Sequence, residues 1–108
     1  MPWSLQYALI KRAVVNQAGP GTLVLAPASV NNRHKVLGFW LGMANNGSLQ
    51  FTDNTGILMG AINQQSNTPS MVFPVGVVPF IETAINSPLN LVTTGGAGKG
   101  VVIYVTEP

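Results

Sequence analysis

Short runs of residues in which apolar side chains recur at every second position most constrain the fold of this chain. The run KVLGFWLGMA (35–44) is the longest of them. A period of two is typical of a β-strand with one buried face, because successive side chains of a strand point to opposite sides. Further strands are predicted at 21–27, 56–62, 70–76, 88–94 and 99–106.

The chain has 108 residues, which is the size of one domain. Many short strands with frequent turns predict a β-sandwich, a jelly roll or a small barrel. We therefore predict one all-β domain over residues 1–108, a jelly-roll-like β-sandwich of about eight short antiparallel strands. Residues 1–20 form either an N-terminal arm or the first strand. The segment LQYALIKRAVV also fits one or two helical turns, although a strand with Leu5, Tyr7 and Leu9 on one face is favoured.

Glycine, asparagine and proline mark the turns between the runs. Asn46-Gly47 is the favoured sequence for a two-residue hairpin loop, so residues 35–62 are predicted to form a three-stranded meander. Asp53 lies in the turn signal Asp-Asn-Thr-Gly, where its carboxylate would accept hydrogen bonds from backbone N–H groups. Pro74 and Pro79 bracket VGVV and indicate an edge strand or an irregular crossing there.

Two of the predicted strands carry apolar side chains on both faces. Leu37, Phe39, Leu41 and Met43 are expected on one face of the first run, and Val36, Gly38, Trp40 and Gly42 on the other. Trp40 then fits either core packing or a contact between subunits. The run VVIYV (101–105), which includes Tyr104, is apolar on both faces, as in a strand at a sandwich centre or at an interface.

Charged residues make up only 7% of the chain, against about 25% in ordinary soluble domains. Amide, hydroxyl and apolar groups take their place. Such a surface is easy to desolvate and suits a permanent assembly with other protein, although a monomer with a neutral polar surface is the alternative. Net charge is +2, and five Lys and Arg cannot neutralise many phosphates, so we expect no nucleic-acid partner.

The residue types needed for catalysis or metal binding are scarce. The chain has three carboxylates, one histidine and no cysteine, which excludes a closed zinc site and a thiol nucleophile. In TTGGAGKG (93–100) Lys99 is followed by Gly100 and a strand, so this segment predicts a flexible hairpin loop and not a phosphate-binding loop. We predict no enzyme, no catalytic, cofactor or metal site, and no small-molecule substrate. No apolar run approaches the roughly 20 residues of a membrane helix, and no signal peptide is expected.

Arg33, His34 and Lys35 are the only dense basic group of the sequence. They are predicted to form a solvated entry to a strand. The alternative is a contact with an acidic partner surface.

Three segments carry a resemblance to a known family: KVLGF (35–39), SLQFTDNTGILMG (48–60) and PFIETAINSPLNLVTTGGAGKGVVIYV (79–105). The chain resembles small jelly-roll or β-sandwich decoration (cement) proteins of tailed-phage virions, with the cluster P-x-x-E-T-A, L-N-L, a glycine-rich turn and a tyrosine-bearing last strand. It departs from the usual E-T-A-x-G, because Ile85 and Asn86 follow the alanine.

The resemblance implies a non-enzymatic structural protein on the capsid exterior of a virion, made in the host cytoplasm. Its expected partners are the shell of the major capsid protein and a second or third copy of itself, as a homodimer or homotrimer. The shell contact is expected to be mostly apolar and amide-mediated. The alternatives are a tail or fibre module and a lectin-like domain that stacks sugars or a receptor on Trp3, Trp40 or Tyr7. The candidate interface residues are Trp3, Tyr7, Arg33, His34, Lys35, Trp40 and Tyr104.

Overall fold

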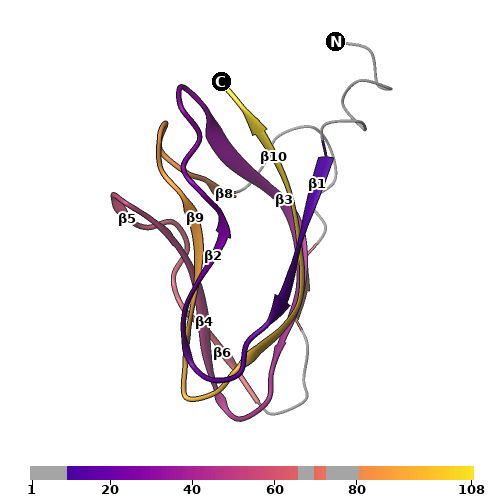
Figure 1. The fold of residues 1–108 in the computed structure, drawn as a ribbon. Coiled ribbons are helices and arrows are strands. Elements are labelled where there is room, and N and C mark those ends of the chain that lie inside the picture. Colours follow the sequence, from indigo (N-terminus) through magenta and orange to yellow (C-terminus); the bar gives the residue numbers. More distant parts are fainter. Residues whose placement is uncertain (1–9, 66–69, 73–80) are drawn as a thin grey trace.

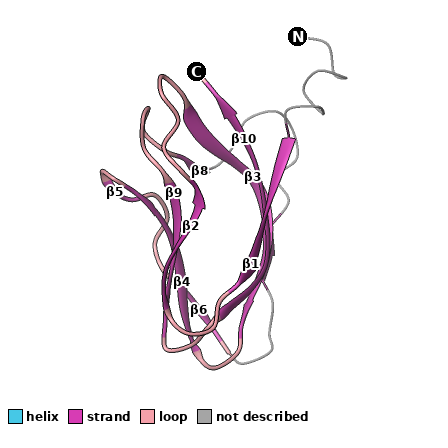
Figure 2. Cartoon of the chain, viewed as in Figure 1, coloured by secondary structure: helices cyan, strands magenta, loops and turns pink. Residues whose placement is uncertain are grey.

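The computed structural model describes residues 10–65, 70–72 and 81–108, and all regular structure in these residues is β-strand (Figure 2). The strands are β1 (Ile10–Asn16), β2 (Gly21–Ala26), β3 (Arg33–Met43), β4 (Gly47–Asp53), β5 (Gly56–Ile57), β6 (Ile62–Gln64), β7 (Ser70–Val72), β8 (Ile81–Glu82), β9 (Leu89–Thr94) and β10 (Gly98–Glu107). Within these ranges there is no helix that could cross a membrane.

Two antiparallel sheets face each other and form the sandwich (Figure 1). We call sheet A the order β1-β10-β3-β7, with β8 also beside β3. Sheet B has the order β2-β9-β4-β5, with β6 also beside β4. Since β7 and β8 share one edge of β3, and β5 and β6 share one edge of β4, each sheet has four strand positions. Eight positions in this order form a jelly roll, which confirms the predicted fold class.

The core lies between the two sheets and is filled by alternate side chains of their inner faces. Phe39 of β3 and Phe51 of β4 meet across it, with ring centroids 5.2 Å apart and planes tilted by 55°. Each fully buried side chain of this size contributes roughly 1.5–3 kcal/mol to folding. The other large side chains that are fully buried among the described residues are Val15, Val36, Leu41, Met43, Leu49, Leu89, Leu91, Thr93 and Val102.

The loop containing Asn46 crosses from one sheet to the other. β3 belongs to sheet A and β4 to sheet B, so the predicted hairpin at Asn46-Gly47, and with it the meander over 35–62, is wrong. Neither residue has the positive φ of that hairpin turn. Gly47 is needed for another reason: a Cβ there would lie 2.0 Å from the carbonyl oxygen of Thr94. The glycine-rich loop before Gly98 also crosses between sheets, from β9 to β10, and is not a hairpin.

The turn after β4 is a true hairpin and depends on Asp53, as predicted. Asp53 Oδ1 accepts hydrogen bonds from the backbone N–H of Thr55 (2.7 Å), the hydroxyl of Thr55 (2.6 Å) and the N–H of Gly56 (3.2 Å). Its Oδ2 accepts from the N–H of Ala84 at 2.7 Å, which fastens the segment after β8 to sheet B. Burial alone raises the pKa of the Asp53 carboxyl, but these hydrogen bonds outweigh burial and hold it below the usual 3.8.

A β-bulge in β3 changes which of its side chains enter the core. Val36 pairs with Tyr104 and Gly38 with Ile103, so Leu37 is an extra residue without a partner in β10. Val36 is consequently buried on the core side, as are Phe39, Leu41 and Met43 further along the strand. The predicted faces were therefore wrong for Val36 and Leu37, because one inserted residue reverses the alternation.

Some predictions fall outside the described residues. The edge strand between Pro74 and Pro79 is one of them, and the placement of Leu5, Tyr7 and Leu9 is another. From Ile10 onward the N-terminal segment is strand, paired with β10 over all seven residues of β1.

Candidate functional site

The charged side chains are distributed very unequally between the two sheets. Residues 1–9, 66–69 and 73–80 contain no Asp, Glu, Lys, Arg or His, so the described residues hold every charged side chain. All of these lie on strands of sheet A except Asp53, which lies on β4 of sheet B. Sheet A thus carries five cations and two carboxylates, a formal excess of three positive charges.

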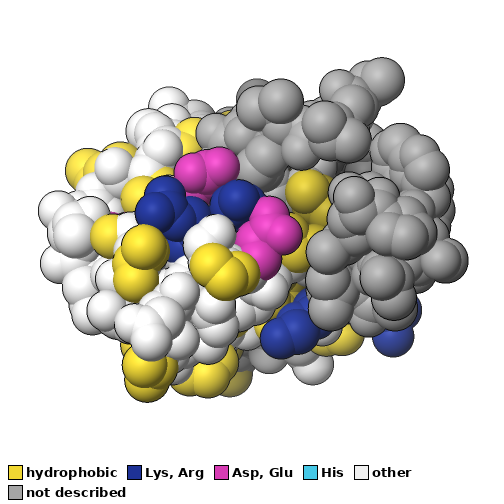
Figure 3. Space-filling view, turned by 90° about the horizontal axis from the view of Figure 1, so that it is seen from above, with side chains coloured by type: hydrophobic (Ala, Val, Ile, Leu, Met, Phe, Trp, Pro, Cys, Tyr) yellow, Lys and Arg dark blue, Asp and Glu magenta, His cyan; other side chains and the backbone are white. Residues whose placement is uncertain are grey.

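Both carboxylates of sheet A are engaged at the end of the sandwich where β10 finishes. Lys35 Nζ lies 2.8 Å from Glu107 Oε1, and Arg33 lies 3.7 Å from Glu82. Figure 3 shows basic and acidic side chains next to each other on this end. The basic group of the sequence is therefore largely neutralised within the molecule, although a role for Arg33 and Lys35 in an interface stays a prediction.

His34 is part of the interior and not a solvated basic group. It is only 3% exposed, which contradicts that prediction. Its Nε2 lies 2.8 Å from the carbonyl oxygen of Pro27, and its Nδ1 lies 2.8 Å from Thr106 Oγ1. A carbonyl oxygen can only accept, so Nε2 donates the hydrogen bond to Pro27. Tyr104, which packs edge-on against the ring at 5.9 Å, is also buried in the core.

Three cations have no carboxylate partner: Lys11 and Arg12 of β1, and Lys99 of β10. Lys99 Nζ donates to Asn16 Oδ1 at 2.7 Å and to the carbonyl oxygen of Gln17 at 3.0 Å, both neutral acceptors. These contacts orient the Lys99 side chain without cancelling its charge. The three unpaired cations account for the surplus charge of sheet A.

An apolar row crosses the outer face of sheet A. Val14 pairs with Val101, and Val101 pairs with Trp40, so the three side chains lie side by side on β1, β10 and β3. Val14 is 68% and Trp40 is 48% exposed, whereas their neighbours Val15 and Phe39 are buried in the core. Trp40 therefore does not fill the core, which was one of the two alternatives for it.

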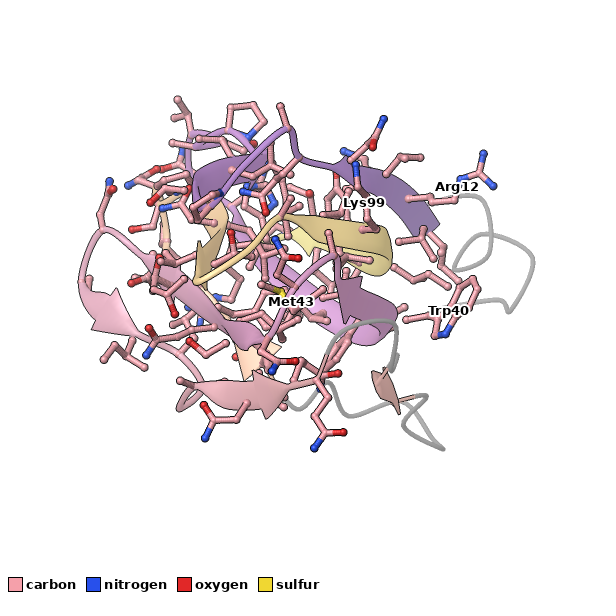
Figure 4. The ribbon with its side chains drawn as sticks, turned by 90° about the horizontal axis from the view of Figure 1, so that it is seen from below. Arg12, Trp40, Met43 and Lys99 are labelled. Atoms are coloured by element: carbon pink, nitrogen blue, oxygen red, sulfur yellow. The ribbon has the colours of Figure 1, made fainter. Side chains whose placement is uncertain are left out.

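The apolar row is flanked by cations on both sides along the strands. Two residues further along β10 in one direction, on the same outer face, lies Lys99. Two residues away in the other direction lies Ile103, which pairs with Arg12 of β1. Figure 4 shows Arg12 and Trp40 projecting from the same side of the molecule, while Met43 lies in its interior. We call this surface the Trp40 face; it consists of Ile10, Arg12, Val14, Trp40, Lys99, Val101, Ile103 and Val105.

Gly100 allows the strands beneath Trp40 to approach each other. Its φ is +139°, and a Cβ at this position would lie 1.9 Å from the backbone oxygen of Trp40. A side chain at residue 100 would therefore push β10 away from β3 and displace the indole.

The outer face of sheet B contains no charged side chain. It carries hydroxyl and amide groups together with the exposed Val24 and Ile57. A polar hollow lies at one end of this face, lined by Asn46, Gly47, Ser48, Asn63, Gln64, Gln65, Thr94 and Gly95. Among the described residues no three His, Asp or Glu side chains are grouped to hold a metal ion. This hollow offers neutral hydrogen-bonding groups but no nucleophile paired with a base.

The structure brings together only part of the residue set proposed from the sequence. Trp40 lies on the outer face, Arg33 and Lys35 lie at its end in ion pairs, and Tyr104 lies behind it in the core. Trp3 and Tyr7 fall outside the described residues. Sequence reasoning missed Arg12, Val14 and Lys99, because they join Trp40 only through the β1–β10–β3 register.

Comparisons of this chain with family models, with curated proteins and with solved structures find no match.

Proposed function

We propose that this chain is a non-enzymatic structural protein that binds other protein through the Trp40 face. In its finer form, the proposal is a decoration or cement protein that stabilises the head shell of a tailed phage, as the resemblance implies. The observation that carries it is the apolar row Val14–Val101–Trp40 on the outer face of sheet A, set between unpaired cations.

Such a row has a cost that a binding role would offset. Monomeric soluble proteins rarely expose large contiguous apolar patches. Where such a patch is exposed, it usually marks a site of interaction with another molecule. Tryptophan and arginine are enriched among the residues that dominate binding energy at protein interfaces. Jelly rolls occur in viral capsid domains and in lectin domains. This is a similarity of fold only, so the function has to be argued from the residues of the site.

The proposal includes self-association as a homodimer or homotrimer. Face-to-face stacking of two Trp40 faces would bring Arg12 and Lys99 of both copies together without a carboxylate between them. Copies should therefore meet through neutral surface elsewhere. Sedimentation at micromolar concentration would give a dimer or trimer, and a pure monomer of 11.4 kDa that also stays monomeric on particles would contradict this part.

Electron cryomicroscopy of phage particles produced by the genome that encodes this chain tests the proposal. The expected result is density for the sandwich at symmetric positions on the outside of the head. Density only at the tail would favour the tail or fibre module, and particles without the chain would contradict a virion role.

A lectin-like domain is the second candidate, because a half-exposed Trp40 on a sheet face could stack on a sugar ring. Titration with a panel of oligosaccharides would then show saturable binding that the Trp40→Ala variant loses. The absence of saturable binding by any sugar of the panel would count against this candidate.

A further inference from the structure

We infer that the Trp40 face docks on an acidic protein surface, with Trp40 seated in an apolar hollow and Arg12 and Lys99 paired with carboxylates around it. This inference rests on the proposed function and names the chemistry of the partner surface. Under that proposal, the surface belongs to the head shell.

The charge distribution indicates an acidic partner. The two carboxylates of sheet A, Glu82 and Glu107, form ion pairs with Arg33 and Lys35. The carboxylate of Asp53, on sheet B, is buried and accepts hydrogen bonds within the chain. Among the residues that the structure describes, no other acidic side chain remains for Lys11, Arg12 and Lys99. Complementary charge guides association and sets register, whereas like charges across an interface cost several kcal/mol.

The positions of the cations fit a rim around an apolar centre. Lys99 lies one register line to one side of the apolar row, and Arg12 lies one line to the other side. Adjacent lines on one face of a strand are about 7 Å apart. Interfaces commonly have this form, with an apolar anchor at the centre and polar groups at the rim.

The indole N–H of the half-exposed Trp40 side chain can donate to a partner. Within the part of the chain that the structure describes, its indole N–H donates no hydrogen bond. A carboxylate or carbonyl oxygen of a partner can accept from it, and an aromatic side chain with an apolar body and one donor suits an interface.

A second copy of this chain is a poor occupant for the same surface. Its own Trp40 face offers the same cations and no free carboxylate, and the outer face of sheet B has no charged side chain. Neither surface complements Arg12 and Lys99. An acidic surface on a different protein does.

The test adds purified chain to phage particles that lack it and measures the bound fraction by co-sedimentation against concentration. We expect Trp40→Ala to weaken binding about 30-fold or more, as for an interface anchor. Arg12→Gln with Lys99→Gln should weaken it about tenfold at 0.05 M salt and about twofold at 0.5 M, because salt screens exposed charges.

A matched control makes the same change of net charge on the opposite sheet. Thr22→Glu with Gln50→Glu also shifts the charge by two negative units, and both residues lie on the outer face of sheet B. This variant should bind within about twofold of wild type. Far-UV circular dichroism and unfolding midpoints should show all variants folded, since each replaced side chain is at least partly exposed.

A zero-length carbodiimide, which joins lysine amines to carboxylates, identifies the paired groups on loaded particles. Links from Lys99 to aspartate or glutamate of the shell protein are expected. Binding that only the control pair weakens would overturn the inference while leaving the shell-binding function in place. Self-association lost in Trp40→Ala, with shell binding intact, would overturn it in favour of a second copy. Failure of the wild-type chain to bind particles would overturn both.

Discussion

The two outer faces of this sandwich differ most clearly in their charge. The outer face of sheet A combines an exposed apolar row with unpaired cations, whereas that of sheet B carries hydroxyl and amide groups, the exposed Val24 and Ile57, and no charge. The single charge on sheet B, Asp53, is turned into the structure and accepts four hydrogen bonds. A low total charge thus conceals a strong asymmetry, because the unpaired cations lie on sheet A alone.

The largest expected effect is a loss of stability at Gly100, where β10 packs closely against β3 beneath Trp40. Gly100→Ala places a Cβ 1.9 Å from the backbone oxygen of Trp40 at a φ of +139°, so we expect a loss of about 4 kcal/mol in the free energy of unfolding. Denaturant unfolding measures it. Gly19→Ala is the control, because a Cβ there meets nothing within 4 Å, and it should change stability by less than about 1 kcal/mol. Equal losses in the two variants would refute the role given to Gly100.

The next largest effect compares how much the charge of Asp53 on sheet B and that of Glu107 on sheet A contribute to stability. Asp53→Ala removes the acceptor of four hydrogen bonds and should cost about 3 kcal/mol, which lowers Tm by roughly 10–20 °C. Glu107→Gln, at a partly exposed ion pair, should cost only about 0–1 kcal/mol. A larger loss in Glu107→Gln than in Asp53→Ala would reverse the comparison.

The pH dependence of stability provides an independent check on Asp53. Its pKa is lower in the folded chain than in the unfolded one, so the stabilisation is complete above the unfolded value of about 3.9. It is lost as the pH falls through the lower, folded pKa. Unfolding midpoints of wild type and Asp53→Asn should therefore converge as the pH falls below about 4. A constant difference down to pH 2 would contradict the hydrogen-bonded carboxylate.

A smaller effect concerns the ion pairs that mask Arg33 and Lys35. Glu82→Gln with Glu107→Gln should change stability by about 1 kcal/mol or less, since both pairs are partly exposed. It also raises the number of unpaired cations on sheet A from three to five, so binding to acidic particles at low salt should become several-fold tighter. Weaker binding of this variant would mean that these carboxylates themselves contact the partner.

The smallest effect compares one exposed valine from each face. Val14→Ser on sheet A and Val24→Ser on sheet B should each change the unfolding free energy by about 0.5 kcal/mol or less, because both side chains are more than half exposed. Thermal unfolding of the two variants measures this. Only Val14→Ser should also weaken particle binding. A marked loss of stability in that variant alone would mean that Val14 serves folding and not a partner.

Local patterns in the sequence predicted most of the strands and the Asp53 turn, because alternation and turn chemistry are properties of neighbouring residues. The single strand predicted at 56–62 is wrong, since only Gly56–Ile57 and Ile62 of this run are strand, in β5 and β6. They did not predict which strands pair. The loops at Asn46-Gly47 and before Gly98 have hairpin-like sequences but cross between sheets, and only the long-range order of the jelly roll decides this. The single bulged residue, Leu37, has no partner in β10. It reverses the inward and outward alternation for the residues of β3 that precede it in the chain.

The candidate site was predicted less well than the fold. Trp40 was identified because it stands out within its own strand. Arg12 and Val14 lie 26 residues or more before it and join it only through the β1–β10–β3 register, which no local pattern reveals. The burial of His34, and the neutralisation of Arg33 and Lys35 by Glu82 and Glu107, likewise depend on contacts between distant strands.

Hydroxyl-radical labelling of Trp40, free and on particles, tests the central claim most directly. Trp40 and Ile57 are both substantially exposed, on sheet A and sheet B respectively, so each should be labelled in the free chain. On particles we predict strong protection of Trp40 and unchanged labelling of Ile57. Protection of Ile57 with Trp40 still reactive would show that sheet B faces the partner, and would contradict the account.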